Sequence, residues 1–172
     1  MKNIVILGST GSIGTNTLDI VDRFPQEFRV VGLTAGSNDE KLEAQIRKFR
    51  PAFAALANEA AAARLRDRCA DLPVKILAGN EGVAEVAQSQ EAELVISAIV
   101  GGAGLLPTLA AIRAGKQIAL ANKEPMVMAG ALMQAEAKKH HVRIFPIDSE
   151  HSAIFQSLEG HRREDVKRII LP

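Results

Sequence analysis

The sequence predicts an α/β protein with a mainly parallel sheet and helices on both of its faces. Short apolar segments alternate with helical patterns throughout the 172 residues. The segments are mostly continuous runs of Val, Ile and Leu, which is typical of parallel strands buried on both faces. Because parallel neighbours need crossover connections, the intervening helices are expected to cover both sides of the sheet. The predicted strands are Asn3–Leu7, Phe28–Leu33, Pro51–Leu56, Val74–Leu77, Leu94–Ala98, Gln117–Leu120 and Val142–Ile147.

Helical periodicity fills the intervals between these strands. Asn58 is the expected N-cap of one helix, and Gly115 the expected C-cap of another. In the first helix, a period near 3.6 residues defines an apolar face made of Ile13, Thr17, Ile20, Val21 and Phe24. The other predicted helices are Asp39–Phe49, Glu59–Cys69, Gly82–Gln88, Gly104–Ala114 and Glu124–His140.

The composition is that of an ordinary globular protein, with 47% hydrophobic and 24% charged residues. A formal net charge of +1 and a lack of Trp and Tyr argue against nucleic-acid binding. The single cysteine, Cys69, excludes an internal disulfide. No apolar stretch approaches the roughly 20 residues of a membrane helix, and the N-terminal apolar run is too short for a signal peptide. We therefore expect a cytoplasmic protein that binds neither nucleic acid nor membrane.

A glycine-rich loop, ILGSTGSIG at residues 6 to 14, joins the first strand to the first helix. Gly8, Gly11 and Gly14 follow a G-x-x-G-x-x-G pattern rather than the commoner G-x-G-x-x-G. In Rossmann-like, doubly wound folds, such a loop brings backbone N–H groups and a helix N-terminus against a pyrophosphate. Further donors suited to phosphate oxygens are the hydroxyls of Ser9, Thr10 and Ser12. The alternative is a tight turn with a purely structural role.

The end of the second strand, LTAGSN at residues 33 to 38, bears on the choice of nicotinamide cofactor. NAD sites usually place Asp or Glu here to hold the ribose 2′-hydroxyl. This segment has no carboxylate, and Ser37 and Asn38 can donate hydrogen bonds to a 2′-phosphate. The pattern favours NADP, although the segment contains no Arg or Lys, and a simple loop is the alternative.

A third polar segment, IALANKEP at residues 118 to 125, follows a buried strand. Asn122, Lys123 and Glu124 emerge at the carboxyl end of this strand, where open α/β sheets bind ligands. Pro125 suits the first turn of the next helix. Lys123 would place positive charge beside a substrate anion or a cofactor. The alternative is a solvated helix start.

A pair of carboxylates occurs in FPIDSEHSAIFQ, residues 145 to 156. Asp148 and Glu150 stand two residues apart at a strand end, so an extended backbone would point both in the same direction. Their hard oxygen atoms suit Mg²⁺ or Mn²⁺, and Ser149 and His151 would join a substrate network. The alternative is an acidic helix N-terminus that complements the helix dipole.

The C-terminal segment has a different pattern. A short helical pattern with Ala153, Ile154 and Leu158 apolar precedes the charged EGHRREDVKR. The IIL that follows predicts the start of a strand, and a strand needs neighbours. We therefore expect a first domain of residues 1–147, followed by residues 148–172 as the first segment of a truncated second domain.

Several stretches together resemble the 1-deoxy-D-xylulose 5-phosphate reductoisomerase family, namely GSTGSIG, AGSN, SAIVGGAGLLPTLAAIRAGKQIALANKE and PIDSEHSAIFQSL. The similarity covers essentially the whole chain, as the family's N-terminal NADPH-binding domain and the beginning of its catalytic domain. It implies an oxidoreductase and isomerase that requires NADPH and either Mg²⁺ or Mn²⁺. Such an enzyme converts 1-deoxy-D-xylulose 5-phosphate to 2-C-methyl-D-erythritol 4-phosphate for isoprenoid precursors, by the non-mevalonate route. The resemblance also implies a homodimer in the full-length enzyme.

The resemblance assigns roles to individual residues. It implies metal ligation by Asp148 and Glu150, and substrate contact and catalysis by Lys123, Ser149 and Glu150. Cofactor binding is implied for Thr10, Gly11, Ser12 and Ile13 at the phosphates, for Ala35, Gly36, Ser37 and Asn38 at the adenosine end, and for Asn122 and Glu124.

The chain departs from the family pattern at a few positions. Ser37 stands where many members have a basic residue, and Pro125 and Met126 replace the usual Ser-Leu. The family's SGGPF loop, its third metal carboxylate and its active-site lid are expected after Leu171, so the 172-residue chain is expected to be inactive alone. One alternative is a stand-alone NADP(H)-binding module without catalysis. Another is a different Rossmann oxidoreductase, such as a homoserine dehydrogenase, which would not explain DSEHSAIFQ.

Overall fold

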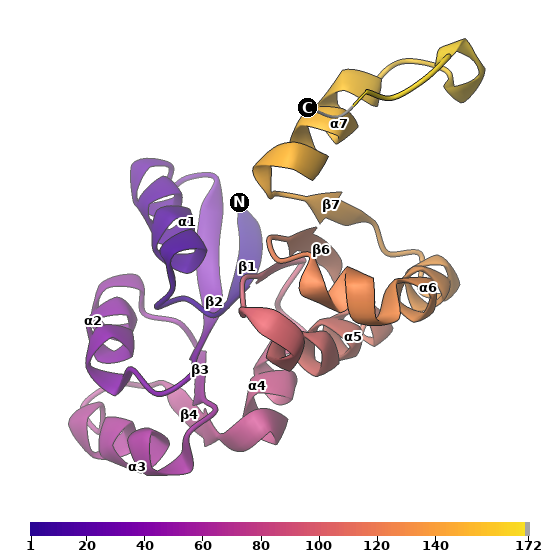
Figure 1. Cartoon of the computed structure of the whole chain (residues 1–172). Coiled ribbons are helices and arrows are strands. Elements are labelled where there is room, and N and C mark those ends of the chain that lie inside the picture. Colours follow the sequence, from indigo (N-terminus) through magenta and orange to yellow (C-terminus); the bar gives the residue numbers. More distant parts are fainter. Residues whose placement is uncertain (171–172) are drawn as a thin grey trace.

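The strands pair side by side in the order β4-β3-β2-β1-β5-β6-β7, and every pairing in the described chain is parallel. This computed structural model describes residues 1–170. The chain starts at β1 in the middle of the sheet and adds strands on one side as far as β4. It then crosses over β1 and adds β5, β6 and β7 on the other side (Figure 1). The doubly wound sheet predicted from the sequence is thus confirmed. The strands are β1 (Lys2–Leu7), β2 (Phe28–Ala35), β3 (Phe53–Leu56), β4 (Lys75–Ala78), β5 (Leu94–Ser97), β6 (Gln117–Leu120) and β7 (Ile144–Pro146).

Helices connect successive strands and cover both faces of the sheet. Both expected caps are confirmed: Asn58 Oδ1 accepts a hydrogen bond from Ala61 N at 2.9 Å, and Gly115 adopts a φ of +74° just after a helix end. In the described part of the chain, no helix is both long and apolar enough to cross a bilayer. The helices are α1 (Ser12–Arg23), α2 (Asp39–Phe49), α3 (Glu59–Arg68), α4 (Gly79–Ala87), the 3₁₀ helix η1 (Gly101–Gly104), α5 (Leu105–Arg113), α6 (Glu124–Lys139), α7 (Ser149–Leu158) and the 3₁₀ helix η2 (Arg163–Asp165).

Some elements begin at other residues than predicted, because of local contacts. β7 begins at Ile144 rather than Val142, because Val142 N donates to Ala137 O at 2.8 Å in the turn after α6. α4 begins at Gly79, so Gly82 lies inside the helix. A Cβ at Gly82 would come within 2.8 Å of the Leu77 Cβ. This glycine therefore permits close packing of helix on strand and does not mark a helix start.

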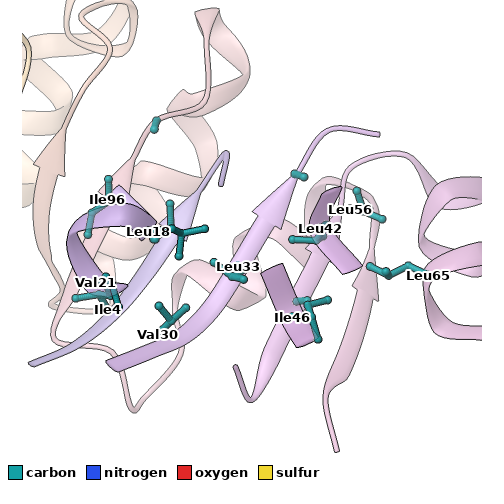
Figure 2. Close-up of a cluster of buried hydrophobic side chains, with 14 of the residues drawn as sticks. Ile4, Leu18, Val21, Val30, Leu33, Leu42, Ile46, Leu56, Leu65 and Ile96 are labelled. Atoms are coloured by element: carbon teal, nitrogen blue, oxygen red, sulfur yellow. The ribbon is translucent and has the colours of Figure 1, made fainter. Parts of the chain in front are cut away.

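Two apolar cores lie on opposite faces of the sheet. Alternate residues of β1 point to opposite sides, with Ile4 and Ile6 in one core and Val5 and Leu7 in the other. The first core packs beneath α1, α2 and α3, and its labelled side chains are shown in Figure 2. The second packs beneath α4, α5 and α6. Burial on both faces explains why the strands read as continuous apolar runs.

The apolar face predicted for α1 is confirmed at Val21 and wrong at Ile13, Ile20 and Phe24. The buried residues are Gly14, Leu18 and Val21, whereas Ile13, Ile20 and Phe24 are exposed. The cause is Gly14, where a Cβ would come within 2.4 Å of Gly8 O. Because the helix approaches the loop so closely at this glycine, it turns the side of Gly14, Leu18 and Val21 to the sheet, and Ile13, Ile20 and Phe24 face outward.

α7 and residues 159–170 extend away from the sheet (Figure 1). The predicted helical pattern is confirmed, but α7 has no buried residue, and it contacts β7 through Phe155, whose ring meets that of Phe145 edge to face at 6.2 Å. The predicted strand start is wrong at Ile169 and Ile170, which are exposed and outside any strand, since no described strand lies beside them. Leu171 lies outside the described residues.

Candidate functional site

The three glycines of the loop after β1 have different surroundings. Gly8 has a φ of +81°, and a Cβ there would lie 2.7 Å from Ala98 O. Gly14 is equally confined, by Gly8 O. Gly11 has an ordinary φ of −75°, and a Cβ there would meet only Gly8 O, at 3.4 Å, among the described atoms. Gly8 and Gly14 are therefore needed for packing, whereas Gly11 leaves the outer surface of the loop open to a ligand.

The N-terminus of α1 offers backbone donors at this open surface. Gly11 is the N-cap, and no side chain in residues 1–170 caps the helix. The first-turn N–H groups, which include those of Ser12 and Ile13, therefore remain available, and the helix dipole favours an anion beside them. Ser12 and Ile13 are exposed, and Thr10 is half-buried.

The prediction that Ser9 donates to phosphate is wrong. Ser9 is fully buried, and its Oγ donates to Gln45 Oε1 at 2.7 Å and lies 3.2 Å from Thr34 O. In return, Gln45 Nε2 donates to Ser9 O at 2.9 Å. Ser9 thus fixes the loop to α2. Its inward direction depends on a partner far along the chain, which local sequence does not reveal.

The turn after β2 contains the residues predicted for the adenosine end. Gly36 and Ser37 are exposed, and Asn38 Oδ1 caps α2 by accepting from Lys41 N at 3.0 Å. The nearest acid, Asp39, is buried and forms ion pairs with Arg64 and Arg68, each at 2.9 Å. The hydrogen bond from the Arg64 guanidinium holds the pKa of Asp39 below its ordinary value. The turn therefore presents no free Asp39 carboxylate to a ribose or a phosphate.

A groove of about 540 Å³ opens at the carboxyl ends of the central strands. Gly8, Gly11, Ala35 and Gly36 form part of its wall. The opposite wall comes from the segment 98–107, where Val100 and Leu106 are apolar yet more than 70% exposed. This wall was missed as part of the site. It lies beside the loop because β5 pairs with β1 at the point where the strand order reverses, and a single sequence does not reveal strand order.

Asn122 follows β6 and carries an unsatisfied donor. Its Nδ2 is shielded from solvent and has no hydrogen-bond partner among the described residues. A buried amide nitrogen in this state fits a ligand that accepts a hydrogen bond, as a cofactor would. Lys123 and Glu124 start α6 as the N-cap and first residue, with Lys123 exposed and Glu124 half-buried.

The carboxylate pair has a different geometry from the one predicted. Asp148 is the N-cap of α7, with Oδ1 accepting from His151 N at 3.0 Å and lying 2.6 Å from His151 Nδ1. Glu150 lies in the first helical turn, so the expected extended backbone is wrong and the acidic helix start is what forms. The physical reason is that Asp is among the best N-caps.

The electrostatics nevertheless connect these carboxylates with Lys123. Burial acts to raise the pKa of Asp148, but the hydrogen bonds from His151 outweigh it and lower that pKa. Hydrogen bonds from its own N–H and from Ser149 lower the pKa of Glu150, with Asp148 raising it and Lys123 lowering it. Both groups are therefore held in the charged form that binds a hard cation. Within residues 1–170, no group of three or more His, Cys, Asp or Glu side chains is placed to hold a metal ion.

Some of the predicted residues line two separate cavities. Lys123 and Asp148 line a cavity of about 650 Å³ between α6, β7 and α7. Gly11, Ala35 and Gly36 line the groove at the central strands. Both places lie at the carboxyl edge of the sheet, but the described residues do not join them in one pocket. The carboxyl edge of the sheet thus carries the uncapped N-terminus of α1, the Asn122 amide without a hydrogen-bond partner, and the carboxylates of Asp148 and Glu150.

Comparison with known proteins agrees with the resemblance. The family model for 1-deoxy-D-xylulose 5-phosphate reductoisomerase matches residues 4–130, and the model for the C-terminal domain of that enzyme matches residues 144–172. The 1-deoxy-D-xylulose 5-phosphate reductoisomerase of Chlorobaculum tepidum is 55% identical over 171 residues, which cover 99% of this chain and 45% of the relative. This chain thus spans less than half the length of the curated relatives that it matches.

Solved structures give the same result. A DOX-P reductoisomerase in complex with NADPH, fosmidomycin and magnesium superimposes with a TM-score of 0.90 at 45% identity, covering 93% of this chain and 40% of that one. The enzyme from Zymomonas mobilis in complex with NADPH gives a TM-score of 0.92 at 40% identity, covering 97% and 44%. The chain belongs to the 1-deoxy-D-xylulose 5-phosphate reductoisomerase family.

Proposed function

We propose that this chain is the cofactor-binding part of a reductoisomerase that converts 1-deoxy-D-xylulose 5-phosphate to 2-C-methyl-D-erythritol 4-phosphate with NADPH and Mg²⁺ or Mn²⁺. The observation that carries the proposal is the glycine loop, in which Gly8 and Gly14 are confined by packing and Gly11 is left open. The named enzymes that share this fold at 40–45% identity bind NADPH, and one of them binds magnesium.

The cofactor would lie along the groove. The backbone around Thr10, Gly11, Ser12 and Ile13 would bind its phosphates, because these donors stand at an uncapped helix N-terminus. Ala35, Gly36, Ser37 and Asn38 would contact the adenosine end, and Asn122 and Glu124 would complete the site. The nicotinamide supplies the hydride for the reduction. The protein would bind and orient the nicotinamide, and the buried Asn122 amide could donate a hydrogen bond to the cofactor.

The substrate would lie at the carboxylate end of the same sheet edge. Asp148 and Glu150 would be two ligands of the divalent ion, which polarises substrate oxygens as a Lewis acid. Lys123 would attract the anionic substrate, and Ser149 would hydrogen-bond to it. With Glu150, these are the residues we propose as catalytic. Water and groups outside residues 1–170 would complete the coordination, since two carboxylates fill few positions of an octahedral ion.

The wider setting follows from the same proposal. We infer a cytoplasmic homodimer for the full-length enzyme, with a small-molecule substrate and no nucleic-acid or membrane partner. We also propose a division after residue 147, because α7 has no buried residue and packs against the edge strand β7. The second candidate function is an NADP(H)-binding module without catalysis.

Calorimetric titration with NADPH and NADH tests cofactor binding, and tighter binding of NADPH is expected. Equal or tighter binding of NADH would contradict it. The choice between enzyme and module needs turnover. In the full-length enzyme, Asp148→Asn combined with Glu150→Gln should remove metal-dependent oxidation of NADPH by 1-deoxy-D-xylulose 5-phosphate. Turnover unchanged by both substitutions would show that the pair is only a helix start.

A further inference from the structure

Lys41 occupies a position between the two segments that we assign to the cofactor. Its side chain reaches from the first turn of α2 to the glycine loop, where Nζ donates to Thr10 O at 2.8 Å. Its backbone N–H donates to Asn38 Oδ1 at 3.0 Å, in the turn after β2. The ammonium group therefore stands beside the loop proposed for the phosphates, while the backbone of Lys41 is bonded to the turn proposed for the adenosine ribose.

The position of Lys41 is fixed by its neighbour one helical turn on. Gln45 lies on the same face of α2, since residues four apart are adjacent on a helix surface. Gln45 is buried and exchanges hydrogen bonds with Ser9 at 2.7 and 2.9 Å. This pair holds α2 against the loop. The ammonium of Lys41 therefore lies beside Thr10 O although its side chain is exposed.

The charge of Lys41 is not neutralised within the described chain. Among residues 1–170, no carboxylate comes within ion-pair distance of Lys41, because the adjacent acid Asp39 is held by Arg64 and Arg68. Its side-chain partner is a neutral carbonyl. An ammonium group has three donors, so it can keep this carbonyl and still bind an anion, and a bond to a charged acceptor is the stronger of the two.

We propose that Lys41 recognises the 2′-phosphate of the cofactor and thereby sets the preference of this chain for NADPH over NADH. The sequence segment 33–38 has no basic residue to fill this role, and Ser37 stands where a cation would be expected. A cation four positions further along, on the helix that begins there, supplies the charge instead. The inference rests on the proposed function, because it requires that the groove bind a nicotinamide cofactor.

The test is calorimetric titration of the whole chain with NADPH and with NADH, in the wild type, Lys41→Gln and Lys41→Arg. Lys41→Gln should weaken NADPH binding roughly tenfold or more, as expected for loss of one charge-assisted bond, and leave NADH binding within about twofold. Lys41→Arg keeps the charge and should keep most of the preference. The matched control is Lys48→Gln on the same helix, whose Nζ pairs with Asp22 at 2.9 Å, and it should change neither affinity.

The outcomes separate this inference from the function on which it rests. If the wild type prefers NADPH and Lys41→Gln leaves that preference intact, Lys41 does not read the 2′-phosphate and the inference is overturned while the proposed function stands. If Lys41→Gln lost affinity for NADPH and NADH equally, Lys41 would only hold the loop in place, and the inference would again be overturned. A preference lost equally in Lys41→Gln and Lys41→Arg would exclude recognition by charge. A wild type that binds neither cofactor would remove the proposed function itself.

Discussion

The glycine loop and the carboxylate segment are held in place by different means. The loop is fixed from distant parts of the chain, with Gly8 packed against Ala98 and Ser9 bonded to Gln45. Asp148 and Glu150 stand at the start of α7, which has no buried residue and is fixed by the bonds of Asp148 to His151, three residues away. The cofactor end is therefore preorganised by tertiary packing, whereas the geometry of the carboxylate end is that of a local helix cap.

The largest expected effect is on cofactor binding at Gly11. Gly11→Leu should reduce NADPH affinity by at least about a hundredfold, because the added side chain would fill the space proposed for the pyrophosphate. The melting temperature should fall only slightly, because Leu is a poorer N-cap than Gly but the φ of −75° suits any residue and the nearest obstacle to a Cβ is 3.4 Å away. Ala60→Leu, on the exposed face of α3, is the control for added bulk. Retained affinity in Gly11→Leu would mean that no phosphate approaches the loop here.

Gly14→Ala should instead act on stability. A Cβ at Gly14 would lie 2.4 Å from Gly8 O and 2.5 Å from Ser9 Cα, so α1 must shift. Overpacking of this kind costs about 1–3 kcal/mol, measured by denaturant unfolding. The matched control is Gly130→Ala in α6, where a Cβ would meet only Met126 Cε, at 3.7 Å. Equal unfolding free energies for the two variants would show that the loop is not tightly packed.

At the carboxylate end, capping and metal binding can be separated with two substitutions. Asp148→Ala should lose the cap, worth about 1 kcal/mol, and expose the α7 amides to faster hydrogen exchange. Asp148→Asn should keep the cap, because Asn caps as well as Asp, but weaken Mn²⁺ binding measured by calorimetry. Both should leave the unfolding of the sheet unchanged. A loss of sheet stability in Asp148→Ala would contradict the local character of this segment.

The smallest effect concerns pH and the ion pairs of Asp39. The Arg64 hydrogen bond lowers the pKa of Asp39 in the folded chain, so its contribution to stability is present above the ordinary pKa of Asp, near 3.9, and is lost as pH falls through the folded value. The melting temperature of the wild type should exceed that of Asp39→Asn by a constant amount above about pH 5, and the difference should shrink in more acid solution. A difference that grows on acidification would reverse the sign of this coupling.

The sequence could predict features that depend on residues near one another in the chain, but not those that depend on tertiary packing. Strand positions were predictable because parallel strands buried on both faces are apolar throughout, as Val5 and Ile6 illustrate by entering opposite cores. The glycine loop was predictable because strand, loop and helix are consecutive. The wall at 98–107 was not, because its place beside the loop depends on the pairing of β5 with β1. Lys41 was missed as well, since its reach to Thr10 depends on how α2 packs.

Errors of detail arose where one local interaction competed with a pattern. Ile20 and Phe24 fit a helical period, but the close approach at Gly14 decided which face of α1 is buried. Asp148 and Glu150 fit the alternation of a strand, but the capping strength of Asp148 started a helix instead. In α1 periodicity gave the type of element and the contact at Gly14 determined its orientation, whereas at Asp148 the cap determined the type of element itself.

The unsatisfied amide of Asn122 would make the folded chain more stable with a bound ligand than without one. A buried donor without an acceptor costs about 1–3 kcal/mol, and the described residues offer Nδ2 none. A ligand that accepts this hydrogen bond removes the cost in the folded state alone, and a ligand present at a hundred times its dissociation constant adds about 2.7 kcal/mol to the free energy of unfolding. Cellular proteases cleave the unfolded fraction, so abundance of the chain would rise and fall with the concentration of the cofactor.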